Sequence, residues 1–168
     1  IKTTLISASA VDLTAVIIFG ISMILLYAAS ATYHLVMAPD KVIAFLRKLD
    51  HSMIFILIAG SYTPFCLIAL KEDKGWILFT VVATIAVCGV LFKMIWFNCP
   101  RWISTCIYIG MGWISIFMIK PLYSSMPFGG IFLLLLGGIF YTIGAIIYAL
   151  KPSALKFKNL GFHEIFHI

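Results

Sequence analysis

The chain has 168 residues, of which 63% are hydrophobic and 11% are charged, and its formal net charge is +6. This composition leaves too few polar side chains to cover the surface of a water-soluble protein, so we expect a lipid bilayer as the solvent. A positive charge can indicate nucleic-acid binding, but the basic residues here stand in short segments between apolar stretches. That placement is typical of the positive-inside bias of membrane proteins, so membrane lipids are the expected partners and nucleic acid is not.

Five stretches lack Asp, Glu, Lys and Arg and are long enough to cross a bilayer as helices, which takes about 17–25 residues. In chain order they cover residues 13–39, 51–70, 75–92, 102–119 and 121–150. Pro121 and Pro127 should keep the start of the last stretch in a loop, so that its helix begins near Phe128. Pro64 should kink the second span. The four cysteines show no C-x-x-C spacing, and we expect buried free thiols.

The fold class predicted by these stretches is all-α, a polytopic transmembrane helical bundle with residues 1–168 in a single transmembrane domain. We expect a sixth span to begin near Gly161 and to be cut at Ile168. The orientation derived below leaves room for one helix before the first stretch. We therefore expect seven helices in the full protein, with the first helix and most of the last one missing from this chain.

Basic residues predict which side of the membrane each loop faces. The segments that follow the first, third and fifth spans carry Lys41, Arg47, Lys48, Lys93, Arg101, Lys151, Lys156 and Lys158. The opposite side receives Lys2, Lys71, Lys74 and Lys120. Eight basic residues against four indicate that the first of these sides is cytoplasmic.

Ionisable residues within a bilayer are functional candidates by default, because each costs about 2.5–3.5 kcal/mol on insertion scales. Six polar residues from three spans converge on the cytoplasmic level: Ser30, His34, Asp50, His51, His163 and His167. Ser30 and His34 are four residues apart and share a helix face, and so do His163 and His167.

Three of the four histidines can form one metal site. His163 and His167 have a spacing that suits a single ion, and His34 is the obvious third ligand. Three neutral imidazoles with an open position are typical of catalytic Zn²⁺. Asp50 would offset the charge of the ion and could hold or deprotonate the water that the metal activates.

Simpler interpretations exist for two of these residues. His51 can be an amphipathic boundary residue, and the hydroxyl of Ser30 can bond a backbone carbonyl. The segment from His163 to His167 also matches H-E-x-x-H, in which Glu164 would be the general base of a metalloprotease. Glu164 lies off the face shared by the two histidines, however, and suits the start of a helix.

Three blocks carry a resemblance to a known family. Residues 30–34 (SATYH), 49–55 (LDHSMIF) with 59–64 (AGSYTP), and 161–167 (GFHEIFH) are similar to the signature blocks of hemolysin III proteins. These proteins are the bacterial branch of the progestin and adipoQ receptor family, which is itself similar to alkaline ceramidases. The resemblance covers essentially the whole chain.

The resemblance implies seven helices and a zinc ion near the cytoplasmic face of the cell membrane. It implies His34, His163 and His167 as ligands, with Asp50 and Ser30 beside them, and it leaves Glu164 outside the site. Family members are linked to hydrolysis of lipid amides, to ligand reception and, in bacteria, to haemolysis. A zinc-dependent hydrolase with a lipid-like substrate is our first interpretation. A receptor or cytolytic protein with structural zinc is the alternative, followed by an intramembrane metalloprotease.

The charge bias predicts that residues 38–49 face the cytoplasm and residues 71–74 face the exterior. A cysteine introduced as Lys74→Cys should react with an impermeant thiol reagent added to intact cells, and one introduced as Lys41→Cys should not. Labelling of the second variant alone would reverse the orientation.

Overall fold

The computed structural model describes residues 10–70, 73–96, 99–125 and 127–150. Throughout this part of the chain the regular structure is helical, and five helical segments are long and apolar enough to cross a membrane. This confirms the predicted class, a polytopic helical bundle. The chain divides into two compact units, Ile1–Phe97 (unit 1) and Asn98–Ile168 (unit 2), and each is described by itself.

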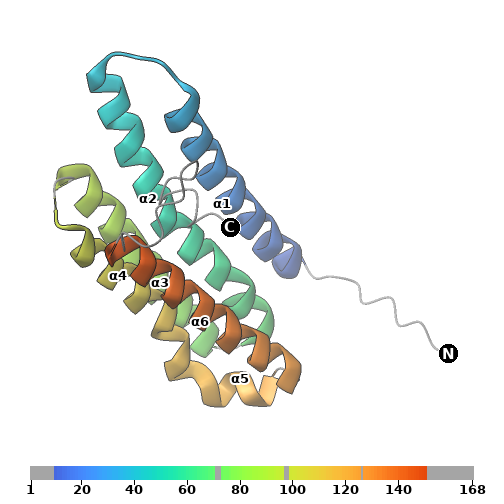
Figure 1. Cartoon of the computed structure of the whole chain (residues 1–168). Helices are drawn as coiled ribbons and strands as arrows, with labels where there is room; N and C mark the ends of the chain where they lie inside the picture. Colours follow the sequence, from blue (N-terminus) through green and yellow to red (C-terminus); the bar gives the residue numbers. More distant parts are fainter. Residues whose placement is uncertain (1–9, 71–72, 97–98, 126, 151–168) are drawn as a thin grey trace. The chain divides into compact units, whose positions relative to one another are not determined.

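Unit 1 is built from three long helices that follow one another back and forth. They are α1 (Ala10–Leu35), α2 (Asp40–Pro64), continued by the π-helical turn η1 (Phe65–Ala69), and α3 (Asp73–Ile95). The link between α1 and α2 is short, so the two helices form an antiparallel hairpin, and α3 then runs back along α2 (Figure 1).

Helix α2 begins eleven residues earlier than the charge-free stretch predicts. Pro39 has extended backbone angles, and its carbonyl accepts hydrogen bonds from the amides of Val42 and Ile43 at 2.8 and 3.1 Å. The helix therefore starts at Asp40, and its first turns carry the exposed residues Lys41 and Arg47. A charge-free window misses such turns, because a helix can extend past the apolar layer and leave its charged ends in the interface.

The end of α2 changes helical type at the predicted kink. Pro64 is the last α-helical residue, and the amide of Leu70 donates to the carbonyl of Phe65 at 3.0 Å, a five-residue step of π geometry. The start of α3 approaches this turn closely, because a Cβ added to Gly75 would overlap the carbonyl oxygen of Cys66.

Two other glycines set the register of unit 1. On α2, a side chain at Gly60 would overlap the hydroxyl and Cβ of Ser22 on α1. On α3, a side chain at Gly89 would overlap the ring of Phe55 on α2, which is 0% exposed. Since lipid tails are as apolar as the side chains, such close contacts rather than hydrophobic exclusion hold neighbouring helices together.

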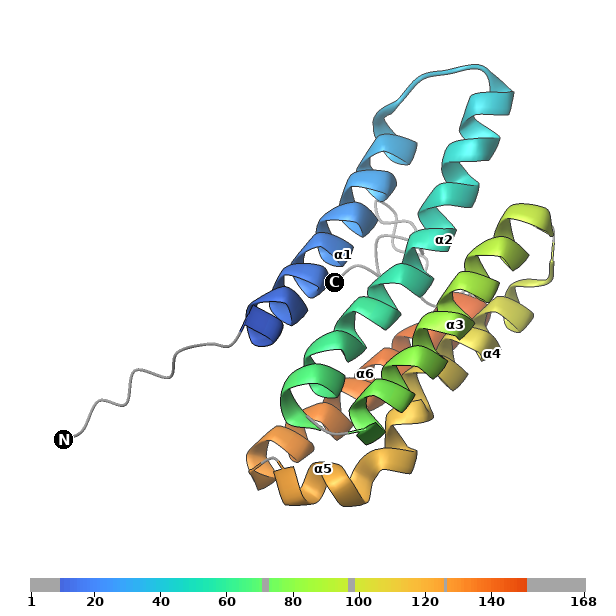
Figure 2. The same ribbon diagram turned by 180° about the vertical axis from the view of Figure 1, so that it is seen from behind.

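Unit 2 contains one composite span and one regular span. The composite span runs through α4 (Arg101–Trp113), the 3₁₀ turn η2 (Ile114–Met118) and α5 (Ile119–Ser125), and it is followed by α6 (Phe128–Leu150) (Figure 2). Across the pair, the indole nitrogen of Trp113 donates to the hydroxyl of Thr142 at 2.9 Å. The predicted start of the last helix at Phe128 is confirmed.

The prediction that Pro121 lies in a loop is wrong. Pro121 is the third residue of α5. Pro121 follows directly on the 3₁₀ turn η2, where the Ile119 amide donates to the Ile116 carbonyl rather than to a residue four positions back. The α-helical ladder is interrupted there, so a residue without an amide is tolerated. Pro127 does precede a helix, and its carbonyl accepts the amide of Gly130 at 2.8 Å.

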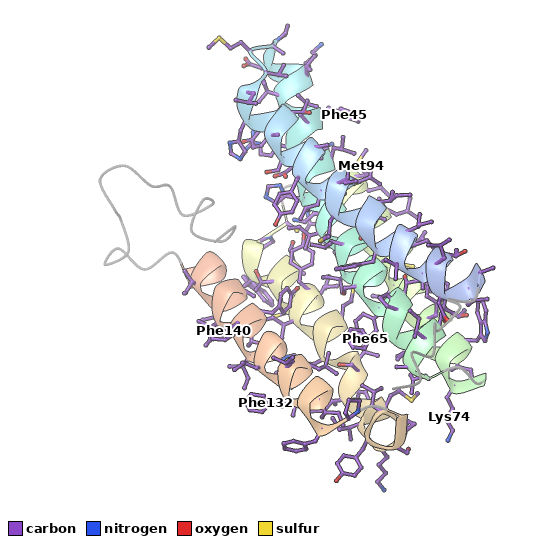
Figure 3. All side chains as sticks on the ribbon, turned by 90° about the vertical axis from the view of Figure 1, so that its right-hand side faces the viewer. Phe45, Phe65, Lys74, Met94, Phe132 and Phe140 are labelled. Carbon is purple, nitrogen blue, oxygen red and sulfur yellow. The ribbon has the colours of Figure 1, made fainter. Side chains whose placement is uncertain are left out.

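The outward faces of these helices are apolar, as a bilayer solvent requires. Phe132 and Phe140 of α6 are exposed and project away from the helix (Figure 3). Exposed apolar side chains such as these suit contact with lipid rather than with water.

All four cysteines are free thiols, as expected, but only Cys66 and Cys99 are buried, whereas Cys88 and Cys106 are exposed.

The close contact at Gly60 generates a prediction with an internal control. Gly60→Val should destabilise the protein by about 1–3 kcal/mol, the usual cost of overpacking, because its side chain would collide with Ser22. Gly20→Val makes the same replacement on α1 where nothing lies within 4 Å of the new Cβ, and it should cost less. Thermal denaturation in detergent measures both variants, and equal melting temperatures would contradict the packing.

Candidate functional site

Two of the predicted site residues are buried polar groups of the α1–α2 hairpin. Ser30 of α1 is 7% exposed, and Asp50 of α2 is 3% exposed. Asp50 lies within a helix long and apolar enough to cross the membrane. A carboxylate removed from water in this way is costly unless charged or hydrogen-bonding groups surround it.

The register of the hairpin brings these two residues to one level. Starting from the contact between Ser22 and Gly60, Ser30 lies eight residues further along α1. Asp50 lies ten residues back along the antiparallel α2. At a rise of 1.5 Å per residue the two steps are about 12 and 15 Å, so Ser30 and Asp50 sit within about one helical turn of each other along the axis.

A third buried polar residue at this level was missed by the sequence interpretation. Lys93 was counted among the cytoplasmic loop charges, but it lies inside α3, is 4% exposed, and belongs to the last turn of that helix. Its only sequence signal is its position one residue after an apolar stretch. Ser30, Asp50 and Lys93 are together called the inner polar layer below.

His51 makes a local hydrogen bond that fits its interpretation as a boundary residue. Its Nδ1 lies 2.8 Å from the carbonyl oxygen of Arg47, one turn earlier in α2. The same nitrogen is 3.7 Å from a carboxylate oxygen of Asp50. The ring is therefore held against its own helix, with Asp50 as its nearest charged neighbour along the chain.

His34 lies one turn beyond Ser30, in the last turn of α1. Unlike Ser30 it is exposed, and its ring stands 4.8 Å from that of Tyr33, centre to centre. Four residues correspond to a step of about 6 Å along the helix, so His34 lies within about one helical turn of the level of Asp50.

The other two predicted ligands, His163 and His167, lie outside the described residues, as does Glu164. Among the residues that the structure describes, no group of three or more His, Cys, Asp and Glu side chains forms a metal cluster. The three-histidine site therefore stays a prediction. The donor set is consistent with it, since an exposed imidazole lies about one turn from a buried carboxylate that a divalent cation would help to compensate.

The five spans with a buried polar layer in unit 1 define a multi-pass α-helical membrane protein. The family whose sequence profile is described as "Haemolysin-III related" matches residues 1–168, and the chain belongs to this family. This confirms the resemblance drawn from the three sequence blocks.

Two relatives show how much of the chain is shared. "Hemolysin-3 homolog" of Bacillus subtilis (strain 168) is 43% identical over 156 residues, which are 93% of this chain and 70% of the relative. "Hemolysin-3" of Bacillus cereus is 44% identical over 164 residues, which are 96% of this chain and 70% of the relative. No solved structure gives a significant match.

Proposed function

We propose that the protein is a zinc-dependent hydrolase of the membrane, acting near the cytoplasmic leaflet on a lipid-like substrate, with acyl amides as the class to test. The observation that supports this most is the burial of Asp50 and Ser30 at one level of the α1–α2 hairpin, about one turn from His34. A carboxylate buried within a membrane span is costly, and such residues are functional candidates by default.

His34, His163 and His167 would hold the metal in this proposal. A zinc ion bound by three imidazoles supplies a Lewis acid for an acyl carbonyl and lowers the pKa of a water molecule to about 7. Asp50 is not a metal ligand in this proposal. Its carboxylate would carry negative charge beside the ion and would bind the proton that the attacking water releases.

Asp50 and Ser30 of the α1–α2 hairpin have the remaining catalytic roles in this proposal. The Asp50 carboxylate accepts a proton from water and returns it to the nitrogen of the leaving amine. The Ser30 hydroxyl donates a hydrogen bond to the carbonyl oxygen as negative charge develops there. Both groups are removed from bulk water, and this strengthens each electrostatic contact.

Cytolysis is the second candidate, and the names of the two relatives motivate it. In that case zinc would tie helices together without turnover. Lysis of erythrocytes by the purified protein, at equal rates for wild type and Asp50→Asn, would favour this second function over the hydrolase.

The metal site predicts a clear pattern of zinc content. The whole protein should bind about one zinc ion per chain, and His34→Ala, His163→Ala and His167→Ala should each remove it, because two imidazoles hold the ion weakly. His51→Ala is the control and should retain the metal, since this ring is bonded to the Arg47 carbonyl. Elemental analysis measures all four variants, and zinc retained in the first three would refute the site.

The division of roles predicts the effect of removing one charge. Asp50→Asn should keep zinc and lower the rate of fatty-acid release from ceramides or related acyl amides by about a hundredfold or more, the scale for losing a general base. Glu164→Gln should have little effect, whereas the metalloprotease interpretation predicts the reverse. Equal rates for wild type and Asp50→Asn at matched zinc occupancy would contradict this mechanism.

A further inference from the structure

Lys93 is the most unexpected ionisable residue in the described part of unit 1. It lies on α3, two residues before the end of that helix, yet only 4% of it is exposed. A lysine at a membrane interface ordinarily extends its ammonium group toward water. Burial of this side chain therefore requires a group that compensates its charge.

The end of its own helix is one candidate for that group, because carbonyl oxygens at a helix C-terminus attract cations. That role is already served by another lysine. The ammonium of Lys48 on α2 donates to the carbonyl oxygen of Met94 at 3.3 Å. The α3 terminus thus already has one cation, which reduces the attraction it offers to a second.

The register of α2 and α3 brings Asp50 to the level of Lys93. From the contact between Phe55 and Gly89, Asp50 lies five residues back along α2 and Lys93 four residues forward along the antiparallel α3. These steps are about 7.5 and 6 Å, so the two residues stand at nearly the same height.

One further contact agrees with this placement. The hydrogen bond from Lys48 to Met94 joins residues close to Asp50 and Lys93 on the same pair of helices.

We propose that Lys93 is the counter-charge of Asp50, and that it positions the buried carboxylate within the inner polar layer. A buried pair is strongly coupled: loss of one partner leaves an uncompensated charge, whereas loss of both is tolerated. Lys93 is a positioning residue that acts through Asp50. The part of the proposal that concerns catalysis rests on the proposed hydrolase function, whereas the pairing does not.

A double-mutant cycle on the whole protein in detergent tests the pairing. Lys93→Met and Asp50→Asn should each lower the midpoint of thermal denaturation, Lys93→Met by about 6–20 °C. The double variant should melt above Lys93→Met, because the charge left alone is removed. If a single variant fails to fold, recovery of folded protein in the double variant gives the same support.

Two controls keep this result specific to the pair. Lys74→Met removes an exposed ammonium from the opposite end of α3 (Figure 3), and its effect should add to that of Asp50→Asn. Lys48→Met should behave in the same way. If the effect of Lys93→Met is also additive with that of Asp50→Asn, or if the double variant does not fold, the pairing is wrong and Lys93 serves its own helix.

Kinetics separate positioning from mere stability. Lys93→Met should lower the hydrolytic rate with zinc retained, should have no further effect in the Asp50→Asn background, and should be reversed in large part by Lys93→Arg. An equal loss of rate in Lys93→Arg and Lys93→Met at matched stability would overturn the positioning role. Absence of zinc and of hydrolysis in wild type would refute the proposed function, while the thermal cycle would still decide the pairing.

Discussion

The inner polar layer depends on how closely three helices approach one another. Gly60 lets α1 approach α2 closely, and Gly89 lets the ring of Phe55 pack against the backbone of α3. A side chain at either glycine would overlap its neighbour. Once those two contacts are made, the rise of the α-helix determines the height of every other residue. Ser30, Asp50 and Lys93 come to one level because of this register, although 63 residues separate the first from the last.

The charges of the layer explain why such contacts have to be specific. In hydrocarbon an isolated carboxylate or ammonium is costly, and proximity of the two reduces that cost only when their heights agree. A slip of one helical turn would move Asp50 about 5.4 Å from its level. Close packing at the glycines and charge compensation in the layer therefore select the same arrangement of helices.

Much of this fold follows from hydropathy. Long apolar stretches predicted the five spans, and the start of the last helix near Phe128 was predicted from Pro121 and Pro127, of which only Pro127 lies outside a helix. The early start of α2 was not predictable from charge-free length, because Lys41 and Arg47 are helical but remain exposed. The helical position of Pro121 was missed because the preceding 3₁₀ turn, after which a missing amide is tolerated, could not be located from the sequence.

The candidate site was predictable where spacing along one helix carried the information. Ser30 and His34 share a face of α1, and the burial of Asp50 agrees with its place at the start of an apolar stretch. Lys93 could not be identified in this way. Lys93 matters because it lies beside α2, and the contact between Phe55 and Gly89 sets that position. The sequence pattern of α3 alone does not predict this contact.

Phe55 has one more consequence, which concerns ion leakage. A membrane protein that carries charges along its interior risks conducting protons or cations down the electrochemical gradient. Between the inner polar layer and the far end of α2, Phe55 is wholly buried against Gly89 and leaves no space there for a file of water molecules. At this contact α2 and α3 therefore meet through a close-packed apolar layer, which is the kind of barrier that opposes the passage of water and ions between two helices.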